Sequence, residues 1–187
     1  MNYFIRYLQL LAPFDRETAE VINRIVAVNR LNKGHQLLKD GEVCRYCYLI
    51  EKGIARVYYL KDGREVTAWF SAENGMVSAI DSLFTGQPSQ YNIEILEDAT
   101  VWALQYDKLE PVFDHYPVTE RLARLLVTQN YLLLDERMKL FAFCTAEERY
   151  GRLLEQMPDI FKRVNLGYIA SYLGITQEHL SRIRGKK

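Results

Sequence analysis

The chain has 187 residues, of which 49% are apolar, and its 24 Lys and Arg residues balance 24 Asp and Glu residues. No segment approaches the roughly 18 uninterrupted apolar residues of a membrane helix, and charges near the N-terminus exclude a signal peptide. Three cysteines do not make a disulfide framework, so we expect a reduced, cytoplasmic protein of one large or two small domains.

The N-terminal part of the chain is predicted to be helical, and strands follow it. Tyr3–Leu11 is a short helix, and Asp15–Val28 has an apolar stripe at helical spacing with Asp15 as its cap. From Gly34 a glycine recurs about every ten residues, between runs rich in aromatic and β-branched residues. These runs predict strands at Arg45–Glu51, Ile54–Leu60, Glu65–Ser71, Tyr91–Leu96 and Thr100–Gln105. With a hairpin turn at 61–63, they favour a compact antiparallel barrel or sandwich.

A long helix is predicted next. Asp107 and Glu110 have the spacing of a capping box, which predicts a helix start there. Pro117 opens a second helix, 118–143, whose leucines leave it apolar over a broad arc. Two apolar faces favour contact with both the strands and a second chain, whereas the alternative is a helix buried in its own chain. The expected dimer interface comprises Leu122, Leu126, Gln129, Leu133 and Leu140.

The C-terminal stretch 166–183 has the pattern of a helix-turn-helix. A capping box at Thr145–Glu148 starts the helix before it, and Pro158 ends that helix. Gly174 interrupts the apolar spacing, and Thr176 is a suitable N-cap for the second helix. Polar side chains share the outer face of that helix, which favours contact with base edges in a DNA major groove. The alternative is an ordinary helical hairpin with a solvated face.

Charge distribution favours DNA. Residues 162–187 hold six cations and one acid, so a chain of zero net charge has a basic C-terminal end. The residues that we expect to bind DNA are Thr176, Gln177, Glu178, Ser181, Arg182, Arg184 and Lys186.

No catalytic or metal site is predicted. Cys44 and Cys47 have the CxxC spacing, but on a strand their thiols would lie on opposite faces, and Cys144 is distant in sequence. Packing is therefore the favoured role of this pair, with a redox or metal role as the alternative. The three histidines suggest neither a metal site nor a catalytic triad. We expect no enzymatic activity and no cofactor.

The order of these elements resembles the Crp/Fnr family of bacterial transcription regulators. The likeness is carried by KGIARVYYLKDGREV at 52–66 and IASYLGITQEHLSRI at 169–183, and PSQYNIEILED at 88–98 resembles the Bacteroidetes branch. It implies an α+β fold with an antiparallel, jelly-roll-like β-roll, a long dimerisation helix and a small all-α helix-turn-helix domain. Most or all of the family's wing has no counterpart in this sequence. The expected domains are 1–116, 117–143 and 144–187.

The resemblance implies a homodimer on a palindromic operator. In the family's recognition-helix pattern, an Arg-Glu pair and a later Arg meet bases. Glu178 and Arg182 match this pattern, whereas Gln177 departs from it, so the preferred bases are expected to differ.

The family's cyclic-nucleotide binders carry a Gly-Glu pair, whose acid holds the ribose hydroxyl, and a later Arg that holds the phosphate, and these residues are absent here. Their places are taken by Ala79, Ile80 and Ser89, and no Lys or Arg occurs between Arg64 and Lys108. We therefore expect no binding of cyclic AMP. A neutral or aromatic effector, or none, would suit the expected pocket of Tyr48, Trp69, Ile80, Ser89 and Tyr91. The alternative function is a sensor or interaction module that does not bind DNA.

Overall fold

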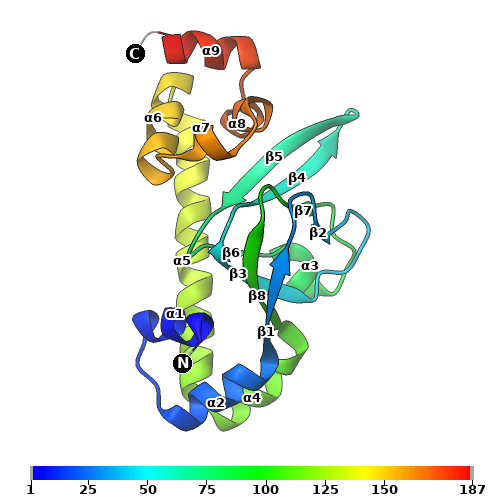
Figure 1. Cartoon of the computed structure of the whole chain (residues 1–187), viewed down its shortest axis with the longest axis vertical. Helices are drawn as coiled ribbons and strands as arrows, with labels where there is room; N and C mark the ends of the chain where they lie inside the picture. Colours follow the sequence, from blue (N-terminus) through cyan, green and yellow to red (C-terminus); the bar gives the residue numbers. More distant parts are fainter. Residues whose placement is uncertain (1, 186–187) are drawn as a thin grey trace.

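One long helix, α5 (Pro117–Phe143), organises the molecule, and the other elements lie along it (Figure 1). The computed structural model describes residues 2–185. Near the start of α5 lie α1 (Tyr3–Leu11), α2 (Arg16–Ile25) and α4 (Glu110–His115). At its other end lie α6 (Ala146–Gln156), α7 (Ile160–Arg163), α8 (Leu166–Leu173) and α9 (Gln177–Gly185). We refer to α6–α9 as the helical unit. None of the helices within 2–185 combines the length and apolar character needed to cross a bilayer.

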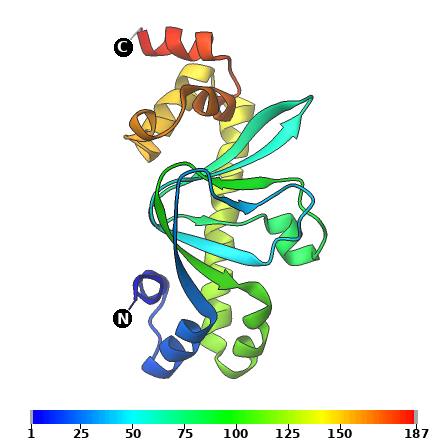
Figure 2. The same ribbon diagram turned by 45° about the vertical axis from the view of Figure 1, so that its right-hand side comes forward.

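Two four-stranded antiparallel sheets form the β-roll beside the middle of α5 (Figures 1 and 2). One sheet has the order β1-β8-β3-β6, with β1 at Val26–Leu31, β8 at Ala99–Gln105, β3 at Tyr46–Lys52 and β6 at Met76–Val77. The other has the order β2-β7-β4-β5, with β2 at Gln36–Leu38, β7 at Asn92–Ile95, β4 at Ala55–Lys61 and β5 at Arg64–Ser71. The α+β prediction with an antiparallel roll is confirmed.

The β4–β5 hairpin extends from the roll towards the helical unit (Figure 2). Its register pairs Lys61 with Arg64, which leaves a two-residue loop. Both loop residues have positive φ, 52° at Asp62 and 73° at Gly63, as this tight hairpin connection requires. The predicted turn is therefore confirmed, and it positions β5 beside α8.

Local sequence signals predicted most of the helix and strand boundaries, and the structure corrects three points. Residues 26–28 belong to β1 rather than to the predicted helix Asp15–Val28, because they pair with β8. Asp107 does not cap a helix: its carboxylate accepts a hydrogen bond from Gln105, and residues 106–108 form a 3₁₀ turn before α4. The sequence analysis also missed β2, β6, α3 (Ile80–Thr85) and α7. The caps at Asp15 and Thr145 are confirmed.

Three clusters of buried apolar residues hold these elements together. The first fills the roll, and the second packs α1 and α2 against Leu49, Leu104 and Leu122. The third is the core of the helical unit, and it includes Ile54, Phe70 and Leu96 from the roll. The helical unit is thus packed on the roll through a shared core.

Candidate nucleic-acid interface and adjoining cavity

The turn between α8 and α9 has helix-turn-helix geometry. Gly174 ends α8 in the left-handed region at φ 69°, and its N–H bonds back to the carbonyls of α8. A Cβ at this position would lie 2.9 Å from Cε1 of Phe141, so both the conformation and the space favour glycine. Thr176 Oγ1 accepts a hydrogen bond from the His179 N–H at 3.2 Å, which confirms the predicted N-cap.

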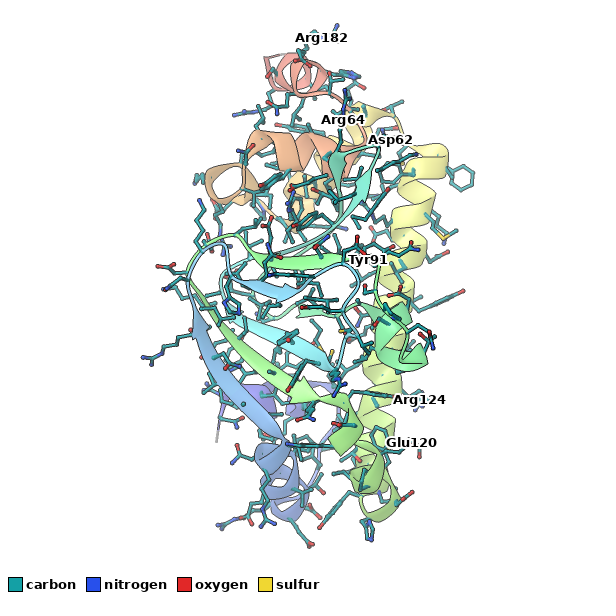
Figure 3. The ribbon with its side chains drawn as sticks, turned by 90° about the vertical axis from the view of Figure 1, so that its right-hand side faces the viewer. Asp62, Arg64, Tyr91, Glu120, Arg124 and Arg182 are labelled. Carbon is teal, nitrogen blue, oxygen red and sulfur yellow. The ribbon has the colours of Figure 1, made fainter. Side chains whose placement is uncertain are left out.

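The outer face of α9 is polar and free within the chain. Leu180 and Ile183 are buried in the helical unit, whereas Gln177, Glu178, Ser181 and Arg182 are exposed. Arg182 lies at the end of the molecule furthest from α1 and α2 (Figure 3). Hydrogen bonds from its own N–H and from Thr176 lower the pKa of Glu178, which keeps it an anion at neutral pH. This face therefore offers both acceptors and donors.

The remaining predicted DNA-binding residues differ in placement. Thr176 and Arg184 are exposed, but the Arg184 guanidinium lies 4.8 Å from the ring centroid of Phe161. The Gln177 side-chain amide lies against Gly167 of α8: a Cβ built on Gly167 would be 2.6 Å from the Gln177 Nε2. Lys186 lies outside the described residues.

Two of the six C-terminal cations are engaged elsewhere. Lys162 pairs with Asp159 at 2.8 Å. Arg163 faces the roll, where Nη1 and Nη2 bond to the Glu73 carboxylate at 3.0 and 2.7 Å and Nε bonds to Glu97 at 3.1 Å. The hydrogen bonds from Arg163 lower the pKa of Glu73 to about 2. The sequence count of free positive charge was therefore too high.

Arg56, on β4, connects the roll to α8. Its side chain is 1% exposed, and Nη2 lies 2.6 Å from a carboxylate oxygen of Glu65 and of Glu94. The guanidinium lies between two rings, 4.1 Å from the centroid of Tyr58 and 3.5 Å from that of Tyr168 on α8. Arg56 is therefore part of a buried ion-pair network and is not available to a ligand phosphate.

Strand β5 makes a second polar connection to α8. The Thr67 N–H donates to Ser171 Oγ at 2.9 Å, and that hydroxyl donates to the Glu65 carbonyl at 3.3 Å. Phe70 and Tyr172 stack beside these bonds, with ring centroids 5.1 Å apart. Helix α8 therefore continues the hydrogen bonding of an edge strand, which fixes how α9 is presented.

A cavity of about 740 Å³ lies between the roll, α5 and the α8–α9 turn. Trp69, Ile80 and Tyr91 line it, as predicted for the ligand pocket, and Tyr91 lies between the roll and α5 (Figure 3). Tyr48 and Ser89 do not line it. Tyr48 is buried in the roll core, and the Ser89 hydroxyl accepts a hydrogen bond from the Tyr91 N–H at 2.9 Å.

The sequence analysis missed the α5 side of this cavity. Asn130, Leu134, Arg137 and Phe141 line it at spacings of four, three and four residues, which places them on one helix face. Arg137 is the one cation among the described lining residues. The predicted broad apolar arc of α5 contained this signal, but nothing in the sequence showed which part of the arc faces the roll.

The exposed apolar face of α5 lies elsewhere than expected. Leu122 is 3% exposed within its own chain, so it is corrected to a core residue, whereas Leu126 is half-buried against the same cluster. Gln129 and Leu133 are exposed and Leu140 is half-buried. A continuous exposed stripe is instead formed at spacings of four and three by Val127, Tyr131, Leu134, Met138 and Phe141.

The two CxxC cysteines have different surroundings. Cys44 Sγ lies 3.3 Å from Ser78 Oγ, and Cys47 lines the cavity. Burial raises the pKa of the Cys47 thiol to about 12, so it is not a reactive thiolate at neutral pH. No group of three or more potential metal ligands is found among residues 2–185.

Comparison with known proteins agrees with the fold. Residues 28–116 match the cyclic nucleotide-binding domain family. The chain is 25% identical to the fumarate and nitrate reduction regulatory protein of Vibrio cholerae, over 95% of this chain and 76% of that protein. The structure of FixK2 from Bradyrhizobium japonicum superposes with a TM-score of 0.73 at 21% identity, covering 87% of this chain and 84% of that one. A putative crp/fnr family regulator from Eubacterium rectale gives 0.72 at 17% identity, covering 95% and 85%.

The chain is Crp/Fnr-like. In this Crp/Fnr-like roll, the places of the family's phosphate-binding residues hold no charge. Ala79 is buried, Ile80 is an exposed apolar residue, and the Ser89 hydroxyl is used within its own loop. The match to the cyclic nucleotide-binding family therefore describes the architecture of the roll, and none of these three residues carries a charge.

Proposed function

We propose that this protein is a cytoplasmic, non-enzymatic transcription regulator that binds a palindromic DNA site as a homodimer. The observation that carries the proposal is the polar outer face of α9, exposed on a helix whose partner α8 is fixed to the roll. Glu178, Ser181 and Arg182 supply the acceptors and donors that base edges require. The proteins from Vibrio cholerae and Eubacterium rectale named above are described as regulators, which supports this function.

The dimer proposed here uses the exposed stripe of α5. Tyr131 is 70% and Met138 72% exposed, although both lie on a helix otherwise covered by the roll and α1. Their spacing of seven continues a heptad pattern, which suits a parallel helix pair around a two-fold axis. Glu120 and Arg124 extend the same face (Figure 3).

DNA binding is tested by selecting bound duplexes from a random pool and measuring affinity against salt. We expect a palindromic site and a linear fall of log affinity with log salt. Arg182→Ala should lose about 1–3 kcal/mol on that site and relax one base preference. Arg16→Ala, an exposed cation on α2 with the same charge change, is the matched control. Absence of salt-dependent binding to any duplex would contradict the proposal.

The dimer is tested by light scattering at micromolar concentration. Met138→Glu should give a monomer, because it places two like charges opposite each other across the two-fold axis. Leu133→Glu is the control: Leu133 is also exposed, but it lies off the stripe. The original sequence-based interface predicts the reverse result for these two variants, so one measurement decides between them.

A further inference from the structure

The cavity described above has the size and lining of a small-molecule site. Its volume of about 740 Å³ lies within the range of roughly 300–1,000 Å³ typical of ligand pockets. Its walls are largely aromatic or aliphatic, and Tyr59, Trp69, Tyr91 and Phe141 contribute rings. Such walls favour a molecule with a flat apolar body.

One end of the cavity holds a cation without an anion. Arg137 forms no ion pair with any residue in the range 2–185, and its Nη2 donates a hydrogen bond to the Tyr172 carbonyl at 3.1 Å. The guanidinium has five N–H donors, so several lack an acceptor in the described chain. Desolvation lowers the pKa of Arg137, which shows that its charge is held out of water at a cost.

A second guanidinium lies near the same wall residue but outside the cavity. Arg149 lies 4.8 Å and Arg137 4.9 Å from the ring centroid of Phe141. Arg149 donates to the Leu173 and Cys144 carbonyls and does not line the cavity. An anion in the cavity would therefore meet Arg137, in a partly desolvated site where Coulomb attraction is strong.

We propose that the cavity binds an aromatic monocarboxylate, with its carboxylate on Arg137 and its ring among Tyr59, Trp69 and Tyr91. A carboxylate matches the planar guanidinium fork in a bidentate geometry. One negative charge is favoured over two, because Asp81 is an acid among the lining residues. A cyclic nucleotide fits less well, since its bulk is a polar sugar and phosphate whereas the walls are largely apolar.

The site also contacts the helical unit. Ser171 and Gly174 line the cavity and belong to α8 and to the turn that leads into α9. A bound ligand would therefore contact the segment that sets the position of α9. An effect of the ligand on DNA binding rests on the proposed function, whereas the existence of the ligand site does not.

The test is calorimetric titration of the full-length chain, without DNA, with phenylacetate, indole-3-acetate and 2-naphthoate. Their primary amides serve as neutral analogues of the same shape, and cyclic AMP is included. We expect at least one carboxylate to bind with a dissociation constant near 100 μM or below, and its amide to bind at least about tenfold more weakly. Arg137→Gln should abolish the preference for acid over amide. Lys139→Gln, an exposed cation on the same helix, should preserve it.

A further variant separates binding from folding. Arg137→Lys keeps the charge without the fork, so it should retain part of the preference for the acid even if Arg137→Gln unfolds. Equal binding of acid and amide, no binding of any carboxylate up to about 1 mM, or tighter binding of cyclic AMP would each overturn the proposal. Failure of the DNA selection would leave this titration unaffected, so the two proposals fail separately.

Discussion

The helical unit meets the rest of the molecule on two sides, and the arginines on those sides have different partners. On the roll side, Arg56 and Arg163 each face two carboxylates. On the α5 side, Arg137 and Arg149 face rings and main-chain carbonyls. Carboxylates therefore neutralise the arginines on the roll side, whereas no carboxylate pairs with the two arginines on the α5 side in the described residues. The roll side is therefore built as a fixed contact, whereas the α5 side is the one that an anion can change.

The largest expected effect comes from removing Arg56. Arg56→Met leaves the nearly buried Glu94 without its cation and removes the guanidinium from between Tyr58 and Tyr168. Breaking a buried pair by removing one partner costs about 3–5 kcal/mol, so the free energy of unfolding in urea should fall by that amount. Arg64→Ala, at the exposed tip of the same hairpin, should change it by less than about 0.5 kcal/mol. A loss below about 1 kcal/mol for Arg56→Met would show that the roll side is not fixed by this network.

A smaller effect with a distinct pH dependence is expected for Arg163→Ala. The pKa of Glu73 is held at about 2 in the folded state, below its ordinary value of 4.5. Between these values the unfolded chain binds more protons than the folded one, so stability falls as pH drops from about 5 to about 2. The variant should lose about 1–2 kcal/mol at pH 7 and show a shallower acid-side slope. Urea unfolding at several pH values measures both, and parallel pH profiles for parent and variant would contradict this account.

The smallest expected effect is a gain in stability. Thr67→Val replaces a buried hydroxyl that has no partner in the described structure by a methyl group of similar size. The unliganded variant should be more stable by about 0.5–1 kcal/mol, because an unsatisfied buried polar group is removed. Thermal unfolding without ligand measures the change. Destabilisation would mean that the hydroxyl is already satisfied in the free protein, and the contrast between the two sides would be weaker.

Elements with local signals were predictable. The cap at Thr145, the hairpin at 61–63 and the αL glycine at 174 each depend on residues within a few positions, so they form wherever the chain places them. The buried and exposed sides of α9 also follow from helical spacing alone. The misassigned cap at Asp107 shows the limit of such signals, since a neighbouring Gln105 amide took the carboxylate instead.

Contacts between residues far apart in the chain could not be predicted from the sequence. Arg163 was counted with the DNA-binding charge, but its partner Glu73 lies 90 residues earlier and becomes a neighbour only when the helical unit packs on the roll. Leu122 and Tyr131 are both apolar positions of one helix. Only the packing of α1 and α2 buries the first and leaves the second exposed. The dimer stripe could therefore not be chosen from leucine spacing.

The sequence by itself determined the order of the elements, the roll, the long helix and the polar face of α9, because propensity, capping and periodicity act over a few residues. Only the tertiary structure decided which charges are free. Arg56, Arg137 and Arg163 are the same residue type in the sequence, and nothing local distinguishes them. Burial raises the cost of an unpaired charge, and whether a carboxylate lies near enough to offset that cost depends on distant segments meeting in space. Two of these arginines meet such carboxylates, and the third, Arg137, faces a cavity.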